Sequence, residues 1–193
     1  MEPVYIENKT FDTSNFNSKH FEKGEYENCI FKSCDLSNAN LSEFKFTDCQ
    51  FTGCNLSLAK LSLTAFRDIQ FTGCKMLGLH FEHCHEFGLS FSFDNCILNH
   101  CIYCKVKMKK TVFKNSQLHE ADFSECDLTG SIFDNCDLAG ATFDNTIIEK
   151  VDFRTSYNYS IDPERNKIKK ARFSLLGVSG LLDKYDIEID NNV

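Results

Sequence analysis

The residues in this chain with the clearest chemical potential are histidines and cysteines near its middle. They fall into two groups about twenty residues apart: His80, His83, Cys84 and His85, followed by His100, Cys101 and Cys104. Nitrogen and sulfur ligands of this kind hold zinc when four of them converge on one point. Convergence depends on the elements that carry these side chains, so the fold decides whether they form a metal site.

Cysteine is unusually frequent, with 11 residues in a chain of 193. Disulfide frameworks belong to secreted proteins, and the N-terminal segment has neither the basic nor the apolar region of an export signal. We therefore expect a cytoplasmic protein whose cysteines are buried free thiols.

Catalytic signatures are missing from the sequence. It contains no Walker A, G-x-S-x-G, H-E-x-x-H or G-x-G-x-x-G motif, and its Ser, His and Asp residues are scattered. We expect a non-enzymatic protein without a cofactor.

Carboxylates are concentrated in one segment of an acidic chain. The formal net charge is −7, which disfavours general binding to nucleic acid because phosphate neutralisation needs clustered Lys and Arg. Fixed outward carboxylates would attract a basic protein surface, although solubility alone also explains such charges. The predicted acidic partner-binding face consists of Glu120, Asp122, Glu125, Asp127, Asp134, Asp137 and Asp144, and it follows a basic run of Lys105, Lys107, Lys109 and Lys110.

The elements that carry these side chains follow a five-residue repeat. Every fifth residue is large and apolar from Ile6 to Phe81 and, after a slip of two residues, from Phe93 to Phe153. At 42% apolar composition, these 29 consecutive matches have a chance probability on the order of 10⁻¹¹. The predicted large core positions include Phe31, Phe46, Phe51, Phe66, Phe71, Phe113, Phe123, Phe133, Phe143 and Phe153.

A second position, two residues before each large one, is usually small. A period of five matches neither a 3.6-residue helix nor a two-residue strand alternation. It fits a four-sided coil in which each side is one pentapeptide and each turn takes 20 residues. Stacked cysteines would then come within the Cα range of a disulfide, although their alternation with Ala, Ser and Thr indicates packing. The predicted small core positions are Cys34, Cys54, Cys74, Cys96, Ala121, Cys126, Cys136 and Ala141.

This geometry opposes the metal site. Cys84 and Cys101 should point inward, whereas His80, His83 and His100 should point outward. The ligands would diverge, so we predict that no metal is bound.

The repeat is interrupted in one place before its end. The two-residue slip predicts a bulge near residues 84–91, and Phe87 should fill the large position that the slip displaces. Near the end, Pro163 cannot donate to a strand ladder and predicts a corner or loop.

The pentapeptides resemble those of the pentapeptide-repeat family, whose unit is A-[D/N]-[L/F]-x-x. The sequence ADFSE at residues 121–125 and CDLTG at residues 126–130 carry this resemblance, which spans about residues 6–173. It implies an all-β fold, a right-handed quadrilateral β-helix. With 20 residues per turn the chain would make about eight coils, and a rise of ~4.8 Å per turn gives a rod of roughly 40 Å.

The C-terminal residues differ from the repeat. We predict a coil domain over residues 1–173 and a tail over residues 174–193, in which helix-like apolar spacing is followed by a short strand at residues 187–189. Both a cap on the last coil and a homodimer interface fit an apolar helix face. The predicted dimer residues are Leu175, Leu176, Val178, Leu181, Leu182, Tyr185 and Ile187.

The chain is similar to one functional group within this family, the albicidin-resistance and quinolone-resistance members that bind topoisomerases. The similarity rests on CNLSL at residues 54–58, FTGCKMLG at 71–78, CILN at 96–99 and IKKARFSL at 168–175. It implies a homodimeric, DNA-mimicking rod that binds DNA gyrase or topoisomerase IV and protects against gyrase poisons, without touching nucleic acid or membranes itself. A generic interaction scaffold with another protein partner is the alternative.

Overall fold

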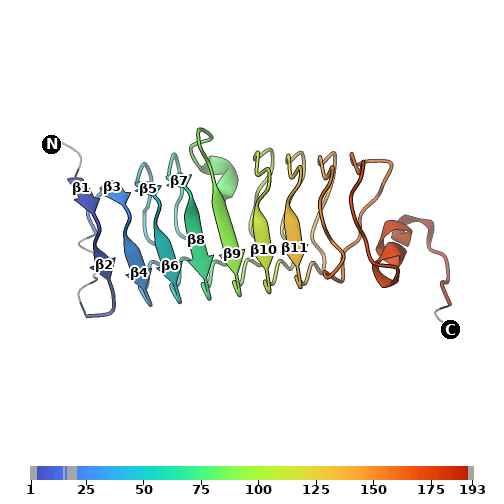
Figure 1. The fold of residues 1–193 in the computed structure, drawn as a ribbon, viewed down its shortest axis with the longest axis horizontal. Helices are drawn as coiled ribbons and strands as arrows, with labels where there is room; N and C mark the ends of the chain where they lie inside the picture. Colours follow the sequence, from blue (N-terminus) through green and yellow to red (C-terminus); the bar gives the residue numbers. More distant parts are fainter. Residues whose placement is uncertain (1–3, 15, 17–20, 191–193) are drawn as a thin grey trace.

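The computed structural model describes residues 4–14, 16 and 21–190 and shows a rod of stacked coils, with the first and last described residues at opposite ends (Figure 1). Strands are short because the chain turns after every five residues. They are β1 Val4–Glu7, β2 Thr10–Phe11, β3 Gly24–Glu27, β4 Ile30–Lys32, β5 Lys45–Thr47, β6 Gln50–Thr52, β7 Ala65–Arg67, β8 Ile69–Thr72, β9 Phe91–Asp94, β10 Val112–Lys114 and β11 Ile132–Asp134. The helical segments are the 3₁₀ turns η2 Phe81–His83, η3 Leu176–Leu181 and η4 Asp183–Tyr185.

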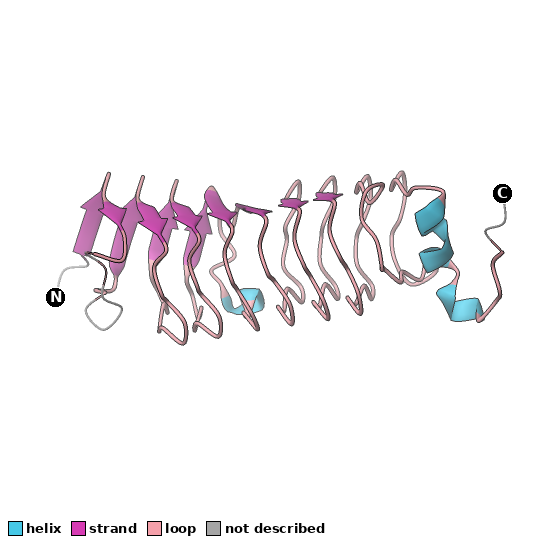
Figure 2. Cartoon of the chain, turned by 90° about the horizontal axis from the view of Figure 1, so that it is seen from below, coloured by secondary structure: helices cyan, strands magenta, loops and turns pink. Residues whose placement is uncertain are grey.

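Two parallel sheets run along the rod. The smaller joins β1, β3, β5 and β7, and the larger joins β2, β4, β6, β8, β9, β10 and β11 in that spatial order. Phe31 pairs with Phe51 and Phe113 pairs with Phe133, so each turn takes 20 residues, or four pentapeptides. The fold is therefore a parallel β-solenoid, and its strands gather along one side of the rod (Figure 2).

The strands of the larger sheet span six turns, from β2 to β11. The sequence count was about eight coils. Past β11 the ladder is carried by single bridges, from Ile132 to Asp152 and from Asp152 to Arg172, and no further strand forms among the described residues. The right-handed, quadrilateral form of the coil stays a prediction.

Stacked aromatic rings fill the interior. One column runs through Phe31, Phe51, Phe71 and Phe93 with ring centroids 4.5, 5.2 and 5.4 Å apart. All ten predicted large positions are buried. Because neighbouring coils are separated by strand spacing, rings one turn apart meet face to face, and rings on adjacent sides of the coil meet edge to face.

The small inward residues have a second role besides their size. The Cys126 thiol donates to the Tyr103 carbonyl at 2.7 Å, the Thr64 hydroxyl to Leu41 at 2.7 Å and the Ser131 hydroxyl to Met108 at 2.9 Å. In each case the acceptor is the large residue 23 positions earlier, in the coil below. Cys, Ser and Thr therefore satisfy a carbonyl that Ala leaves to other partners. All eight predicted small positions are buried.

The corners of the coil use a left-handed backbone. The residue two positions after each large core residue has positive φ, for example Asn38 (57°), Leu63 (58°) and Lys110 (59°). Asparagine and glycine adopt this conformation most easily. The exposed pentapeptide position is thus constrained by the backbone although it contacts no core.

The two-residue slip lies between β8 and β9, where Phe71 pairs with Phe93, an offset of 22 residues. Phe87 does not fill the displaced large position, because it is 76% exposed. Phe91 is buried instead, and its ring packs 5.3 Å from Phe81 and 5.1 Å from Phe93. The extra residues are accommodated in the η2 turn and the loop after it, so the chain re-enters the ladder in time for Phe91 to face inward.

The tail folds differently from the prediction. Its helix is two short 3₁₀ segments, η3 and η4, and the described residues 187–190 form no strand. Gly177 and Gly180 explain part of this, because a Cβ on either would lie about 2 Å from an atom of Tyr159. The tail therefore sits directly on the last coil, and its residues 191–193 lie outside the described part, as do residues 1–3 of the predicted coil domain.

Candidate interaction surfaces

The seven carboxylates of the predicted acidic face encircle the rod, because the segment that carries them is longer than one 20-residue turn. Asp122 is bridged to Ile102, Asp127 to Lys107 and Asp137 to Gln117, three separate ladders, while Asp134 lies in β11. We call Glu120, Asp122, Glu125, Asp127, Asp134, Asp137 and Asp144 the acidic belt.

Three belt carboxylates hold the coil corners. Asp122, Asp127 and Asp137 accept hydrogen bonds from the backbone N–H two residues later, at 2.8, 3.1 and 3.2 Å. Partial burial raises the pKa of Asp127, but hydrogen bonds from Thr129 and Lys109 outweigh it and leave the pKa below its usual range. The Asp of the pentapeptide thus has a structural task that the sequence reading attributed to a partner.

The glutamates of the belt are better placed to meet a partner. The side chains of Glu120 and Glu125 are 69% and 54% exposed, at left-handed corners. They pair with His100 at 3.3 Å and Lys105 at 3.6 Å. Exposed ion pairs of this kind contribute little, so both carboxylates can exchange partners readily.

A second acidic surface lies on the smaller sheet, and the sequence analysis did not find it. Glu7 and Glu27 are paired neighbours on β1 and β3, and Glu25 lies beside them. The hydrogen bond from Tyr5 to Glu27, together with these charges, raises the pKa of Tyr5 to about 12. We call Glu7, Glu25 and Glu27 the N-terminal acidic patch. Its signal in the sequence was the 20-residue spacing of two glutamates.

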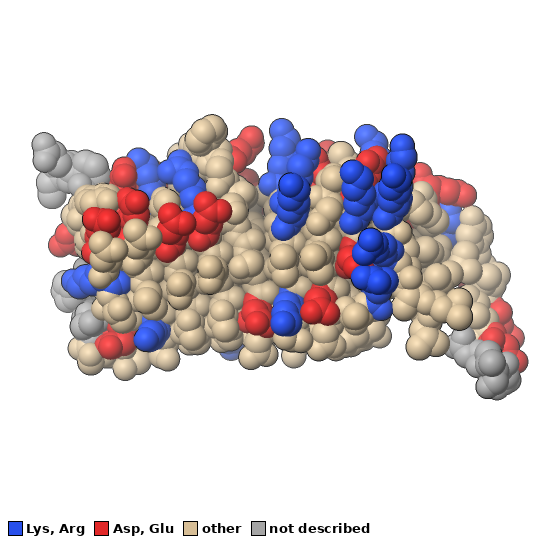
Figure 3. Space-filling model, viewed as in Figure 1, with Lys and Arg blue, Asp and Glu red and all other residues tan. Residues whose placement is uncertain are grey.

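Lysines form a ridge along one corner of the C-terminal half. Lys110, Lys150 and Lys170 share the left-handed corner position, with Gly130 between the first two. A Cβ on Gly130 would lie 3.7 Å from Cγ of Lys110, so that lysine stem covers the gap. Charge therefore changes sign along the rod, with acidic groups over the β1–β7 end and Lys and Arg further along (Figure 3).

The structure separates the predicted cysteine–histidine cluster. Cys84 and Cys101 are buried, and all eleven cysteines are free. Burial raises the pKa of the Cys101 thiol to about 12, which keeps it protonated. His80 and His83, however, lie together with Glu82 on the surface. The H-x-x-H spacing was the available signal for this group.

The tail exposes a pair of leucines at the end of the rod. Leu175 and Leu176 are 91% and 83% exposed, whereas Leu181 packs against the core. The other predicted dimer residues are exposed at Val178, Tyr185 and Ile187 and partly buried at Leu182.

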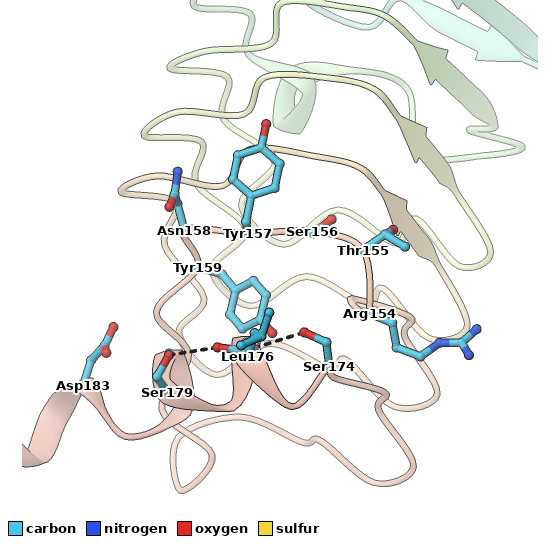
Figure 4. A pocket seen from close by; sticks show the side chains of 12 residues that line it. Arg154, Thr155, Ser156, Tyr157, Asn158, Tyr159, Ser174, Leu176, Ser179 and Asp183 are labelled. Carbon is cyan, nitrogen blue, oxygen red and sulfur yellow. Dashed lines mark hydrogen bonds between the residues drawn. The ribbon is translucent and has the colours of Figure 1, made fainter. Parts of the chain in front are cut away.

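A cleft of about 680 Å³ separates η3 from the last coil. Tyr159 lies between the two, and hydrogen bonds from the Gly177 N–H to Ser174 and from the Ser179 hydroxyl to the Leu176 carbonyl hold η3 (Figure 4). Among the described residues, no helix is long and apolar enough to cross a membrane.

A family model described as a pentapeptide repeat region matches residues 24–92 and 79–153, which together span more than half of the chain. The chain belongs to the pentapeptide-repeat family. The corner-holding Asp residues and the stacked inward rings are the structural expression of that repeat. No curated protein sequence matches this pentapeptide-repeat protein.

Solved structures share the fold. Two trypsin-treated forms of QnrB1, a plasmid-mediated fluoroquinolone resistance protein, superpose with TM-scores of 0.58 and 0.50 at 19% and 21% identity. The alignments cover 97% of this pentapeptide-repeat protein and 98% and 97% of QnrB1. HetL, a pentapeptide repeat protein involved in heterocyst differentiation regulation from the cyanobacterium Nostoc sp. strain PCC 7120, aligns over 90% of this chain and 85% of its own, at 12% identity and a TM-score of 0.43.

Proposed function

We propose that this protein is a non-enzymatic cytoplasmic rod that binds DNA gyrase or topoisomerase IV in place of DNA and protects the enzyme against its poisons. The observation that carries the proposal is the register, in which residues 20 apart lie side by side from β2 to β11. Such a ladder presents charges at fixed intervals along a stiff rod, as DNA does. The fold match to QnrB1, described as a fluoroquinolone resistance protein, supports the same function.

Two acidic surfaces support binding to a basic, DNA-gripping protein. Glu120 and Glu125 of the acidic belt project from corners, and the N-terminal acidic patch adds Glu7 and Glu27. Carboxylates fixed on a rigid scaffold steer a positively charged partner and make its association sensitive to salt.

The test is DNA supercoiling by purified gyrase, with the protein titrated in and with or without a quinolone or albicidin. We expect dose-dependent inhibition or drug protection that weakens as salt is raised. The variant Glu120→Lys/Glu125→Lys should lose this effect, and it leaves the corner bonds of Asp122, Asp127 and Asp137 intact. Glu7→Lys/Glu27→Lys tests the N-terminal acidic patch in the same way.

The matched control is Glu86→Lys/Glu188→Lys, which changes the net charge equally at exposed sites outside both acidic surfaces. It should retain full activity. If both surface variants behave like this control, the acidic surfaces do not bind the enzyme. If the unmodified protein has no effect on several gyrases, the topoisomerase proposal is wrong.

The tail supports homodimerisation, with Leu175 and Leu176 as its centre. Two exposed leucines at the end of a rod form an apolar surface that a second copy would bury. Light scattering should show a dimer for the unmodified protein and a monomer for Leu175→Asp/Leu176→Asp. Leu58→Asp/Leu63→Asp is the control, because those leucines are exposed on the side of the rod. A dimer that survives the first variant places the interface elsewhere.

The mixed charge of the rod favours the scaffold alternative. The lysine ridge of Lys110, Lys150 and Lys170 interrupts the negative surface, which suits a partner carrying both signs of charge. A partner captured from cells that is not a topoisomerase, combined with no effect on supercoiling, would favour this second function.

A further inference from the structure

The interruption of the repeat brings three metal-ligating side chains together on the surface. His80 directly precedes the 3₁₀ turn η2, which contains Glu82 and His83. Side chains three residues apart eclipse one another in a 3₁₀ turn. The imidazole rings of His80 and His83 accordingly stack, with centroids 5.3 Å apart and planes inclined by 8°.

Glu82 lies against both rings. Its Oε1 is 2.7 Å from Nδ1 of His80 and 3.7 Å from Nε2 of His83. Zinc bonds of about 2.0–2.2 Å in a tetrahedron place neighbouring ligand atoms roughly 3.3 Å apart. The two observed separations lie on either side of that value, so small side-chain rotations would bring the ligands to bonding positions.

The second carboxylate oxygen gives independent support. Glu82 Oε2 is buried, and no described residue provides it with a hydrogen-bond partner. A buried carboxylate oxygen without a donor is costly, and a cation bound to the carboxylate would offset that cost.

We propose that His80, Glu82 and His83 bind one divalent transition-metal ion, for which zinc is the probe. Two imidazoles and one carboxylate are a ligand set that zinc uses when it keeps one position open. The histidine side chains are 49% and 58% exposed, so the open position faces solvent, where water or a partner's side chain completes the coordination. The ion would fix η2 at the point where the coil departs from its repeat.

The experiment is calorimetric titration of the full-length protein with zinc chloride under thiol-reducing, chelator-free conditions. We expect one saturable site per chain, with affinity reduced at least about tenfold in His80→Ala and in His83→Ala. Cobalt should give a visible absorption spectrum typical of four-coordinate geometry, and the spectrum should be lost in the same variants.

Two sets of controls make the result decisive. His85→Ala and His100→Ala remove exposed histidines outside the site and should bind zinc normally. Cys104→Ser removes the partly exposed thiol, and loss of binding there with retention in His80→Ala/His83→Ala would assign the metal to the thiol and overturn the proposal. So would the absence of saturable binding by the unmodified protein. Both histidines are exposed, and circular dichroism checks that the variants fold; His83→Asn serves as a second substitution.

Discussion

At the scale of the residue, the small inward position decides more than packing. Ser131 is fully buried, its hydroxyl donates to the Met108 carbonyl at 2.9 Å, and its oxygen accepts from the Thr111 N–H at 3.1 Å. One side chain thus satisfies two backbone groups of the preceding coil. This explains why Ser, Thr and Cys alternate with Ala at a site where volume alone would allow any of them.

Replacing that serine tests this role. Ser131→Ala leaves the buried Thr111 N–H without its acceptor, and we expect a loss of about 1–3 kcal/mol in the free energy of unfolding. Urea denaturation measures it. Ser62→Ala is the control, since Ser62 is exposed and should change stability by less than about 0.5 kcal/mol. Equal effects of the two substitutions would contradict the hydrogen-bonding role.

At the scale of the element, the repeating unit is a five-residue side that ends in a left-handed corner. Asparagine occupies many of these corners, including Asn28, Asn38 and Asn115, whereas Leu58 and Leu63 occupy two others. A branched side chain in this conformation is strained by about 1–2 kcal/mol. The leucine corners are therefore local weak points in an otherwise regular coil.

Leu63→Asn should stabilise the protein by about 1 kcal/mol, because Asn tolerates the left-handed backbone and Leu63 is exposed. Thermal and urea denaturation both report this gain. Leu63→Ala is the matched control, since it removes the same exposed apolar group but keeps the backbone strain. If the alanine variant gains as much stability, the effect comes from removing apolar surface and the strain argument fails.

At the scale of the whole molecule, the C-terminal end of the solenoid is closed by its tail. Lys184 pairs with Asp162 at 2.8 Å and with Glu164 at 2.7 Å, and the Ile161 N–H donates to the Gly180 carbonyl. The hydrogen bonds from Lys184 lower the pKa of both carboxyl groups. Carboxyls with lowered pKa stabilise the folded protein above their unfolded values near 4, and this contribution is lost as pH falls through the lowered values.

We therefore expect Lys184→Gln to lower the melting temperature at pH 7 and to have little effect at pH 3, where both carboxyls are protonated. Thermal denaturation at the two pH values measures the difference. Lys167→Gln, an exposed lysine outside the tail, is the control. An effect of Lys184→Gln that is equally large at pH 3 would show that its packing, and not its ion pairs, holds the tail.

The five-residue period determined by itself which residues face inward. A residue's place in a pentapeptide depends on its own coil, so the aromatic positions from Phe31 to Phe153 and the buried thiols follow directly from counting. The same counting failed where the period breaks. At the slip, the path of η2 decided that Phe91 is buried and Phe87 exposed, and in the tail the contacts of Tyr159 with two glycines decided a pair of 3₁₀ turns.

Surfaces were beyond the sequence for a related reason. Residues that follow one another in the chain, such as Asp122 and Asp137, turn to different sides of the coil, whereas Glu7 and Glu27 become neighbours across 20 residues. Stacking of the coils therefore decided which charges share a surface, and a single 3₁₀ turn brought His80 and His83 together. Inward position is a local property of each pentapeptide, but a binding surface is made between coils, and only the tertiary structure contains it.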